Sequence, residues 1–221
     1  MPNTLTLGTQ RQDAKLVEAG SWAIGVMLAA WLALVAVLAA GGNFVSAPGE
    51  LPRPIALGVA APIVVFLVAL ALSRSVRDFA LEANLPLLTA IQAWRFAGFG
   101  FIALYAYGVL PGVFAWPAGL GDIAIGLTAP WMAAALIRRP AFAASRAFVI
   151  WNLLGILDLV VAVGTGAYGS MSATGAAGEI TTRPMAELPL VLIPAYFVPI
   201  FVMLHVVALA QSIRMARHAV V

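Results

Sequence analysis

The sequence contains no cysteine, and only two of its 221 residues are histidines. Without cysteine the chain has no disulfides, no thiolate metal sites, no iron–sulfur clusters and no thiol redox chemistry. His205 lies within an apolar segment, whereas His218 falls in the C-terminal tail, so a bis-histidine haem is not expected. We therefore expect neither a metal nor a cofactor.

Charged residues are scarce as well. They make up 10% of the chain, whereas soluble domains contain about 25%. Hydrophobic residues make up 63%, and the mean hydropathy is +1.01. The twelve lysines and arginines lie in short clusters between apolar segments, without a basic stripe of interleaved aromatics, so nucleic acid is not the expected partner. The composition predicts an integral membrane protein whose main partner is the lipid bilayer.

Three sequence motifs that would indicate particular enzymes are also missing. The chain has no H-E-x-x-H, no G-x-S-x-G and no G-x-x-x-x-G-K. Zincins, serine hydrolases of the nucleophile-elbow type and P-loop pumps are therefore unsupported.

Six apolar segments are each long enough to cross a hydrocarbon core of about 30 Å at about 1.5 Å per residue. The first is longer than the apolar core of about 7–15 residues in a signal peptide, so we interpret it as a retained span. Helical spacing over 73–86 predicts a short surface helix. The expected organisation is a polar N-terminal segment (1–21), spans at 22–40, 54–72, 88–110, 119–137, 143–166 and 188–212, and a basic tail (213–221). The predicted fold is an all-α bundle of six transmembrane helices.

The distribution of basic residues predicts the orientation, because cytoplasmic loops carry the excess of lysine and arginine. With six spans, nine basic residues fall on the side of the termini: Arg11, Lys15, Arg74, Arg77, Arg138, Arg139, Arg146, Arg214 and Arg217. The other side carries two, Arg53 and Arg183. We therefore expect a multi-pass protein of the bacterial inner membrane with both termini in the cytoplasm.

Polar residues inside the apolar segments are the candidate functional residues, because a charge at the centre of a membrane helix costs about 2.5–3.5 kcal/mol. Counting helical rise from the cytoplasmic ends places Arg95 and His205 at a depth of about 10 Å and Asn152 at about 14 Å. Asp122 and Asp158 both fall at about 22 Å. We expect two layers, with the acidic pair nearer the outer face.

Each of these residues also has a purely structural interpretation. Arg95 lies close enough to the cytoplasmic edge to snorkel to headgroups, and Asp122 lies near a predicted helix N-terminus that it could cap. His205 and Asn152 are residues that commonly serve in packing and in interhelical hydrogen bonds. Asp158 lies well inside an apolar segment without a basic neighbour in sequence, so it needs a proton, a cation or a partner helix.

The tetrapeptide Gly119-Leu120-Gly121-Asp122 resembles the GxGD motif of the intramembrane aspartyl proteases of the presenilin and prepilin peptidase type. The resemblance implies that Asp122 and Asp158 form a catalytic dyad sharing one proton. The chain departs from that family at two places. Its second acid follows the motif instead of preceding it, and Pro194-Ala195-Tyr196 is its nearest match to the family's Pro-Ala-Leu segment.

As a whole, the chain resembles small uncharacterised multi-span proteins of bacterial inner membranes, a resemblance that implies no activity. Our leading hypothesis is not an enzyme. It is a transporter or permeation protein for a small solute or ion, in which Asp158 and Asp122 bind a proton or cation from outside, and Arg95, Asn152 and His205 form an inner gate. An intramembrane aspartyl hydrolase and a non-catalytic assembly partner are the alternatives, and the sequence leaves open whether the chain forms a homo-oligomer.

Overall fold

The computed structural model describes the backbone of residues 4–218 and the side chains of residues 22–217, and this part of the chain is helical without any strand. The first three residues of the expected N-terminal segment and the last three of the expected tail lie outside the described residues. The elements are α1 (Thr4–Ala40), α2 (Arg53–Leu72), α3 (Arg74–Glu82), α4 (Leu85–Ile91), η1 (Gln92–Gly98), α5 (Phe99–Ala106), α6 (Gly112–Arg138), η2 (Pro140–Ala144), α7 (Arg146–Met171), η3 (Arg183–Ala186), η4 (Ile193–Phe197) and α8 (Val198–His218).

Six stretches of helix in the described residues are long and apolar enough to cross a membrane, the number that the sequence predicted. They are Trp22–Ala40, Arg53–Leu72, Leu85–Ala106, Gly112–Arg138, Arg146–Met171 and Ile193–Arg217. The fourth differs most from the expectation, because it begins seven residues before 119. Pro117 lies inside α6 and does not end it, and the helix begins directly after Pro111.

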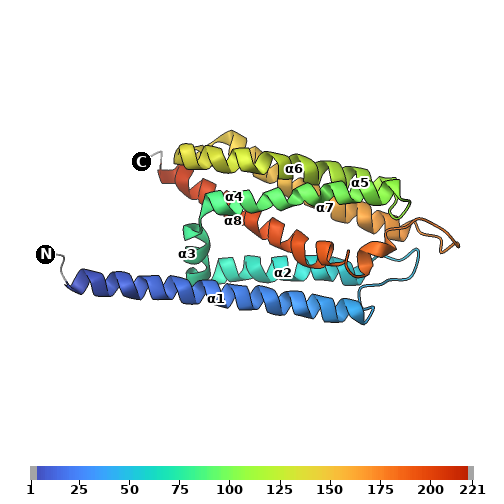
Figure 1. Ribbon diagram of the computed structural model, residues 1–221, viewed down its shortest axis with the longest axis horizontal. Helices are drawn as coiled ribbons and strands as arrows, with labels where there is room; N and C mark the ends of the chain where they lie inside the picture. The colour runs from blue at the N-terminus through green and yellow to red at the C-terminus, as the bar shows by residue number, and fades with distance from the viewer. Residues whose placement is uncertain (1–3, 219–221) are drawn as a thin grey trace.

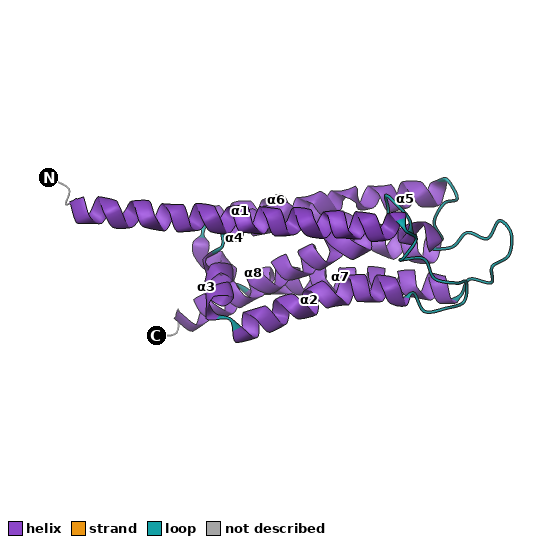
Figure 2. Ribbon diagram, turned by 90° about the horizontal axis from the view of Figure 1, so that it is seen from below, coloured by secondary structure: helices purple, strands orange, loops and turns teal. Residues whose placement is uncertain are grey.

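Both described ends of the chain lie at one end of the bundle (Figure 1). We call this the terminal end, and we call the opposite end, where loops 41–52, 107–111 and 172–182 gather, the loop end (Figure 2). The short helix α3 lies across the terminal end, at a steep angle to the long helices (Figure 1). Loops 41–52 and 172–182 thus cover one end of the bundle together, although they are distant in sequence.

Helix α1 lies at the edge of the bundle, and its N-terminal part extends beyond the other helices (Figures 1 and 2). It contacts the bundle through η4, where the Tyr196 hydroxyl donates a hydrogen bond to the Leu28 carbonyl oxygen at 3.2 Å. Trp31 packs edge to face on the Tyr196 ring, with 4.9 Å between centroids. The centre of the bundle is therefore built by α4–η1–α5, α6, α7 and α8.

Close packing in this centre depends on glycine. A Cβ on Gly126 of α6 would lie 2.2 Å from the backbone nitrogen of Phe96, and a Cβ on Gly98 of η1 would lie 2.8 Å from the carbonyl oxygen of Gly119. Small residues allow helix backbones to approach within the membrane in this way. The backbone of η1 is thus held directly against α6, with Arg95 at the contact.

Polar side chains near the end of α8 hold the terminal end together. The Gln211 side-chain amide donates to the carbonyl oxygens of Ala80 and Ala83 at 2.9 and 3.0 Å, and Arg214 donates to that of Leu81 at 2.7 Å. These three carbonyls belong to the last residues of α3 and to its C-cap, where a helix has no internal donors left. The side chains of α8 therefore fix α3 across the terminal end.

Candidate functional site

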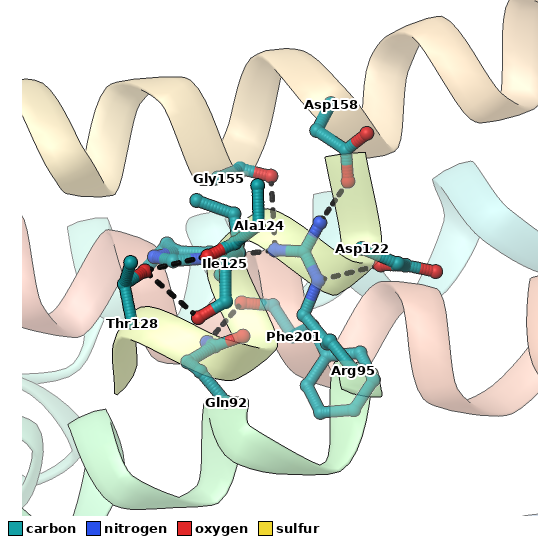
Figure 3. A network of polar contacts seen from close by, with 10 residues as sticks. Gln92, Arg95, Asp122, Ala124, Ile125, Thr128, Gly155, Asp158 and Phe201 are labelled. Atoms are coloured by element: carbon teal, nitrogen blue, oxygen red, sulfur yellow. Dashed lines mark hydrogen bonds and ion pairs between the residues drawn. The ribbon is translucent and has the colours of Figure 1, made fainter. Parts of the chain in front are cut away.

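Arg95 is the centre of a buried polar network, although it is 2% exposed in the middle of an apolar stretch. Its Nε donates to Asp122 Oδ1 of α6 at 2.7 Å, and its Nη2 donates to Asp158 Oδ2 of α7. Figure 3 shows the guanidinium between the two carboxylates. One cation therefore holds two acids from two different helices.

The third nitrogen of the guanidinium contacts a carbonyl and an imidazole. Arg95 Nη1 donates to the carbonyl oxygen of Gly155 at 3.2 Å and lies 3.2 Å from His205 Nε2. The face of the Phe201 ring completes the surroundings, with its centroid 6.0 Å from Arg95 Cζ. All three nitrogens of the guanidinium are thus satisfied by the protein, as a buried arginine requires.

The contacts of His205 define its tautomer. Arginine has only donors, so His205 Nε2 must accept, and the proton of the neutral ring is carried by Nδ1. Nδ1 then donates to Asn152 Oδ1 at 2.8 Å, and the Asn152 amide nitrogen donates to the Phe148 carbonyl oxygen at 2.9 Å. His205 and Asn152, 0% and 1% exposed, form a chain of hydrogen bonds that leads from Arg95 toward the terminal end.

The charges of the network do not balance. Two carboxylates face one guanidinium, and the histidine beside it is neutral in this geometry. With both carboxylates ionised, the centre would carry one more negative charge than the guanidinium balances, in a part of the protein where uncompensated charge is costly. A proton or a monovalent cation would neutralise it.

The glycines of the Gly119-Leu120-Gly121-Asp122 sequence have a packing role here. A Cβ on Gly121 would lie 1.6 Å from Asp158 Oδ1, and a Cβ on Gly119 would lie 2.7 Å from the Ile102 side chain. On α7, a Cβ on Gly155 would lie 2.3 Å from His205 Nε2. Gly121 and Gly155 thus make room for polar side chains of the site, and Gly119 makes room for the apolar side chain of Ile102.

Two buried acceptors lie one turn apart near the centre, on the segment that carries Arg95. Gln92 Nε2 donates to the Phe201 carbonyl oxygen at 3.3 Å, whereas Gln92 Oε1 and Thr89 Oγ1 have no hydrogen-bond partner among the side chains and backbone that the structure describes. Both residues are buried, at 1% and 2% exposure. Unpaired buried oxygens commonly mark the position of an internal water.

A cavity of about 260 Å³ extends from the loop end into the bundle and reaches Asp122. Its deep walls are mainly apolar and include Phe101, Phe114, Leu159 and Val198. Loop residues between 44 and 48 and between 173 and 183 line its mouth. Asp122 therefore lines the cavity, whereas Asp158, Arg95, Asn152 and His205 do not.

The mouth of the cavity is shaped by Glu179. Its carboxylate accepts hydrogen bonds from the backbone nitrogens of Thr174 and Gly175, each at 2.9 Å from Oε2, and from the Thr174 hydroxyl at 3.0 Å. These donors, the Thr174 backbone N–H first, hold the pKa of Glu179 below its ordinary value. Glu179 is thus ionised at neutral pH and closes the turn 174–179 beside the cavity.

Replacing Glu179 with glutamine is expected to speed amide exchange at Thr174 and Gly175. A carboxylate with a lowered pKa contributes stability above its ordinary pKa, and this contribution is lost as the pH falls through the lowered value. The same loosening is therefore expected in the unaltered protein in acid. Hydrogen exchange measured against pH checks this, with Glu50→Gln as the matched control, and equal exchange in both variants would contradict it.

The structure brings all five candidate residues into one network. The Arg95 side chain connects the two expected layers, because it reaches both aspartates while its Nη1 contacts His205. Snorkelling of Arg95 is also wrong, since its side chain is fully buried. Asp122 does not cap a helix, because α6 begins ten residues earlier, at Gly112. Asn152 forms the expected interhelical hydrogen bond, to His205.

Several residues of the site were not identified from the sequence. The Gly155 carbonyl and the Phe201 ring both contact Arg95, yet neither residue type stands out in an apolar helix. The cavity mouth is formed by loops without periodicity. The spacing of Gly119 and Gly126 was the available signal, because glycines seven residues apart lie on one side of a helix and indicate close contact with a neighbour.

Residues 52–212 match the model of a protein family described as "Domain of unknown function (DUF8737)". Comparison with curated proteins gives no match, and neither does comparison with solved structures. The matched residues include every member of the buried network and begin after α1.

Proposed function

The chain belongs to this family of unknown function, and we propose that it is a transporter or permeation protein for a small solute or ion in which Asp158 and Asp122 bind a proton or cation. The observation that carries the proposal is the cavity from the loop end that reaches Asp122, within a centre holding two carboxylates and one guanidinium. Ionisable residues between membrane helices are expensive and commonly mark ion or substrate pathways.

The proposed location is the bacterial inner membrane, with both termini in the cytoplasm. Nine basic residues then lie on the cytoplasmic side and two, Arg53 and Arg183, on the other. The two described chain ends lie at the same end of the bundle, which is consistent with this orientation (Figure 1). In this orientation the cavity opens to the outside.

Arg95, His205 and Asn152 form the proposed inner gate. They close the bundle beyond Asp122 with a continuous set of hydrogen bonds at 3.2 and 2.8 Å, and all three are buried. Neutralising one aspartate breaks its ion pair with Arg95. The ion pairs that join η1 to α6 and α7 therefore depend on what the two acids bind. This dependence couples occupancy of the outer cavity to the packing of the gate.

An aspartyl hydrolase is the weaker proposal for the same residues. A catalytic dyad shares one proton between two facing carboxyl groups, since two like charges at short range cannot both ionise. Here the Arg95 guanidinium lies between Asp122 and Asp158 and pairs with each of them. This arrangement favours binding of charge over dyad chemistry. An assembly partner without turnover is a further alternative, which a stoichiometric co-purifying protein would support.

Replacing Asp158 with asparagine is expected to abolish proton movement while leaving the bundle folded. The variant keeps the Arg95–Asp122 pair and removes one of the two carboxylates that share the guanidinium, so flux falls at least about tenfold without a loss of Tm. The measurement is the pH change reported by pyranine trapped in proteoliposomes when an outward-to-inward gradient of Na⁺, K⁺ or benzylammonium is imposed in turn, with protein-free liposomes as the blank.

Asp78→Asn is the matched control, because Asp78 lies exposed on α3, outside the cavity. Flux in the unaltered protein and in Asp78→Asn that disappears in folded Asp158→Asn supports the proposal. Equal flux in Asp158→Asn and the unaltered protein would overturn it, as would the absence of flux with every added cation.

A further inference from the structure

Resting on the proposed function, we propose that the substrate is a small amphiphilic organic cation whose ammonium group pairs with Asp122 at the floor of the cavity. The same carboxylate that receives a proton would then receive the substrate. The size of the cavity, the chemistry of its walls and the charge at its floor each restrict the ligand.

The apolar walls of the cavity favour a ligand that is largely apolar. Around the floor the cavity is lined by Phe101, Phe114, Leu159, Ile193 and Val198, and its volume is about 260 Å³. Ligand sites commonly combine such apolar walls with a few polar groups that orient the ligand. A ring or short alkyl chain fits this lining, whereas a sugar or a peptide would leave many polar groups without partners.

Asp122 at the floor of the cavity favours a positively charged group on the ligand. Asp122 uses Oδ1 for Arg95, while its second carboxylate oxygen points away from the guanidinium (Figure 3). With both carboxylates ionised, the network would carry one negative charge in excess of its arginine. An ammonium group supplies both the opposite charge and an N–H donor, and such charge-assisted hydrogen bonds are about twice as strong as neutral ones.

The same floor is poorly suited to a bare metal ion. Hard cations require several oxygen ligands, about six for Mg²⁺ and six to eight for Ca²⁺. Within the side chains that the structure describes, no three of the residues His, Cys, Asp and Glu lie together in a group able to hold a metal. An organic ammonium needs fewer oxygen partners, because its alkyl part is stabilised by the apolar walls.

The mouth of the cavity, like its floor, carries negative charge. Glu179 lines the cavity and is ionised, whereas Arg183, the basic residue beside it, is paired with Glu187 at 3.0 Å. These three groups leave one negative charge at the entrance. Charge of one sign along a cleft raises the local concentration of ligands of the opposite sign.

Charge balance makes the proton and the organic cation exclude one another. A single uncompensated charge is neutralised by one proton or by one monovalent cation, and binding both would leave the buried centre positive. Loading of the cation therefore expels a proton, as exchange of the two across the membrane requires.

Benzylammonium is the probe, with benzyl alcohol as the neutral analogue and benzoate as the anionic one. In calorimetric titrations of the full chain in lipid nanodiscs, benzylammonium is expected to bind at least about tenfold more tightly than either analogue. Titrations in buffers of different ionisation enthalpy are expected to show about one proton released per cation bound.

Two variants separate the roles of charge and shape. Asp122→Asn keeps the Arg95–Asp158 pair and is expected to weaken benzylammonium binding at least about tenfold. Ala162→Leu, which narrows the cavity without changing its charge, is expected to weaken binding several-fold. Asp78→Asn is the control and is expected to bind normally. Equal binding of benzylammonium and benzyl alcohol, or unchanged binding in folded Asp122→Asn, would overturn the inference.

The result also distinguishes this inference from the function on which it rests. Asp158-dependent flux of another cation without benzylammonium binding would overturn the substrate class and leave the transport function standing. Asp122-dependent binding without flux of any cation would overturn transport and leave a receptor for the same class of ligand.

Discussion

Replacing Arg95 with glutamine is expected to lower the free energy of unfolding by about 3–5 kcal/mol, the cost of removing one partner from a buried ion pair. The change leaves Asp122 and Asp158 without their cation while both side chains remain largely buried, at 14% and 11% exposure. It also removes the donors that join η1 to α6, α7 and the His205 ring. Unfolding of the reconstituted protein, followed by tryptophan fluorescence, measures the loss.

The matched control is Arg183→Gln, which breaks the exposed Arg183–Glu187 pair. Exposed pairs contribute about 0–1 kcal/mol, so this variant is expected to unfold almost as the unaltered protein does. A triple variant, Arg95→Gln with Asp122→Asn and Asp158→Asn, carries no charge at the centre and is expected to regain much of the lost stability. Equal stability of Arg95→Gln and Arg183→Gln would show that the network does not hold the bundle together.

The helices and the residues that form the site could be predicted from the sequence, because apolar runs and buried charges have large energetic effects in a membrane. Runs of about twenty apolar residues predict helices that span a membrane, and the described residues contain six helices long and apolar enough to do so. The same reasoning selected the polar residues, since each charge within a span needs a partner. The fourth span was expected to begin at 119, whereas α6 begins at Gly112 and contains Pro117.

The contacts within the site could not be predicted, because depth along a helix does not define the direction of a side chain. Each residue of an α-helix is rotated by about 100° from the last, and η1 follows the tighter 3₁₀ winding around Arg95. The backbone depths derived from the sequence separate Arg95 from the aspartates. In the structure the long arginine side chain spans this separation and contacts both carboxylates. The cavity arises from packing of loops against the bundle, for which the sequence carries no periodic signal.

Replacing Gly121 with alanine is expected to remove Asp158-dependent flux almost as completely as Asp158→Asn does, although no charge changes. The new Cβ would lie 1.6 Å from Asp158 Oδ1, so either the carboxylate or helix α7 must move, and the contact with Arg95 Nη2 is lost. Crowding of this kind also costs about 1–3 kcal/mol of stability. Proton flux in proteoliposomes and unfolding of the same sample measure the two effects.

Gly100→Ala is the matched control, because nothing lies within 4 Å of the new Cβ in α5 and alanine favours a helix over glycine by about 1 kcal/mol. The decisive comparison is a double-mutant cycle with Asp158→Ala, which removes the atoms that the new methyl group would meet. If Gly121 acts through Asp158, Gly121→Ala is expected to cost little stability in the Asp158→Ala background, giving a coupling energy of about 1–3 kcal/mol. Additive costs would mean that Gly121 serves the packing of α6 generally, and the close approach of α6 to Asp158 would then have no part in positioning the acid.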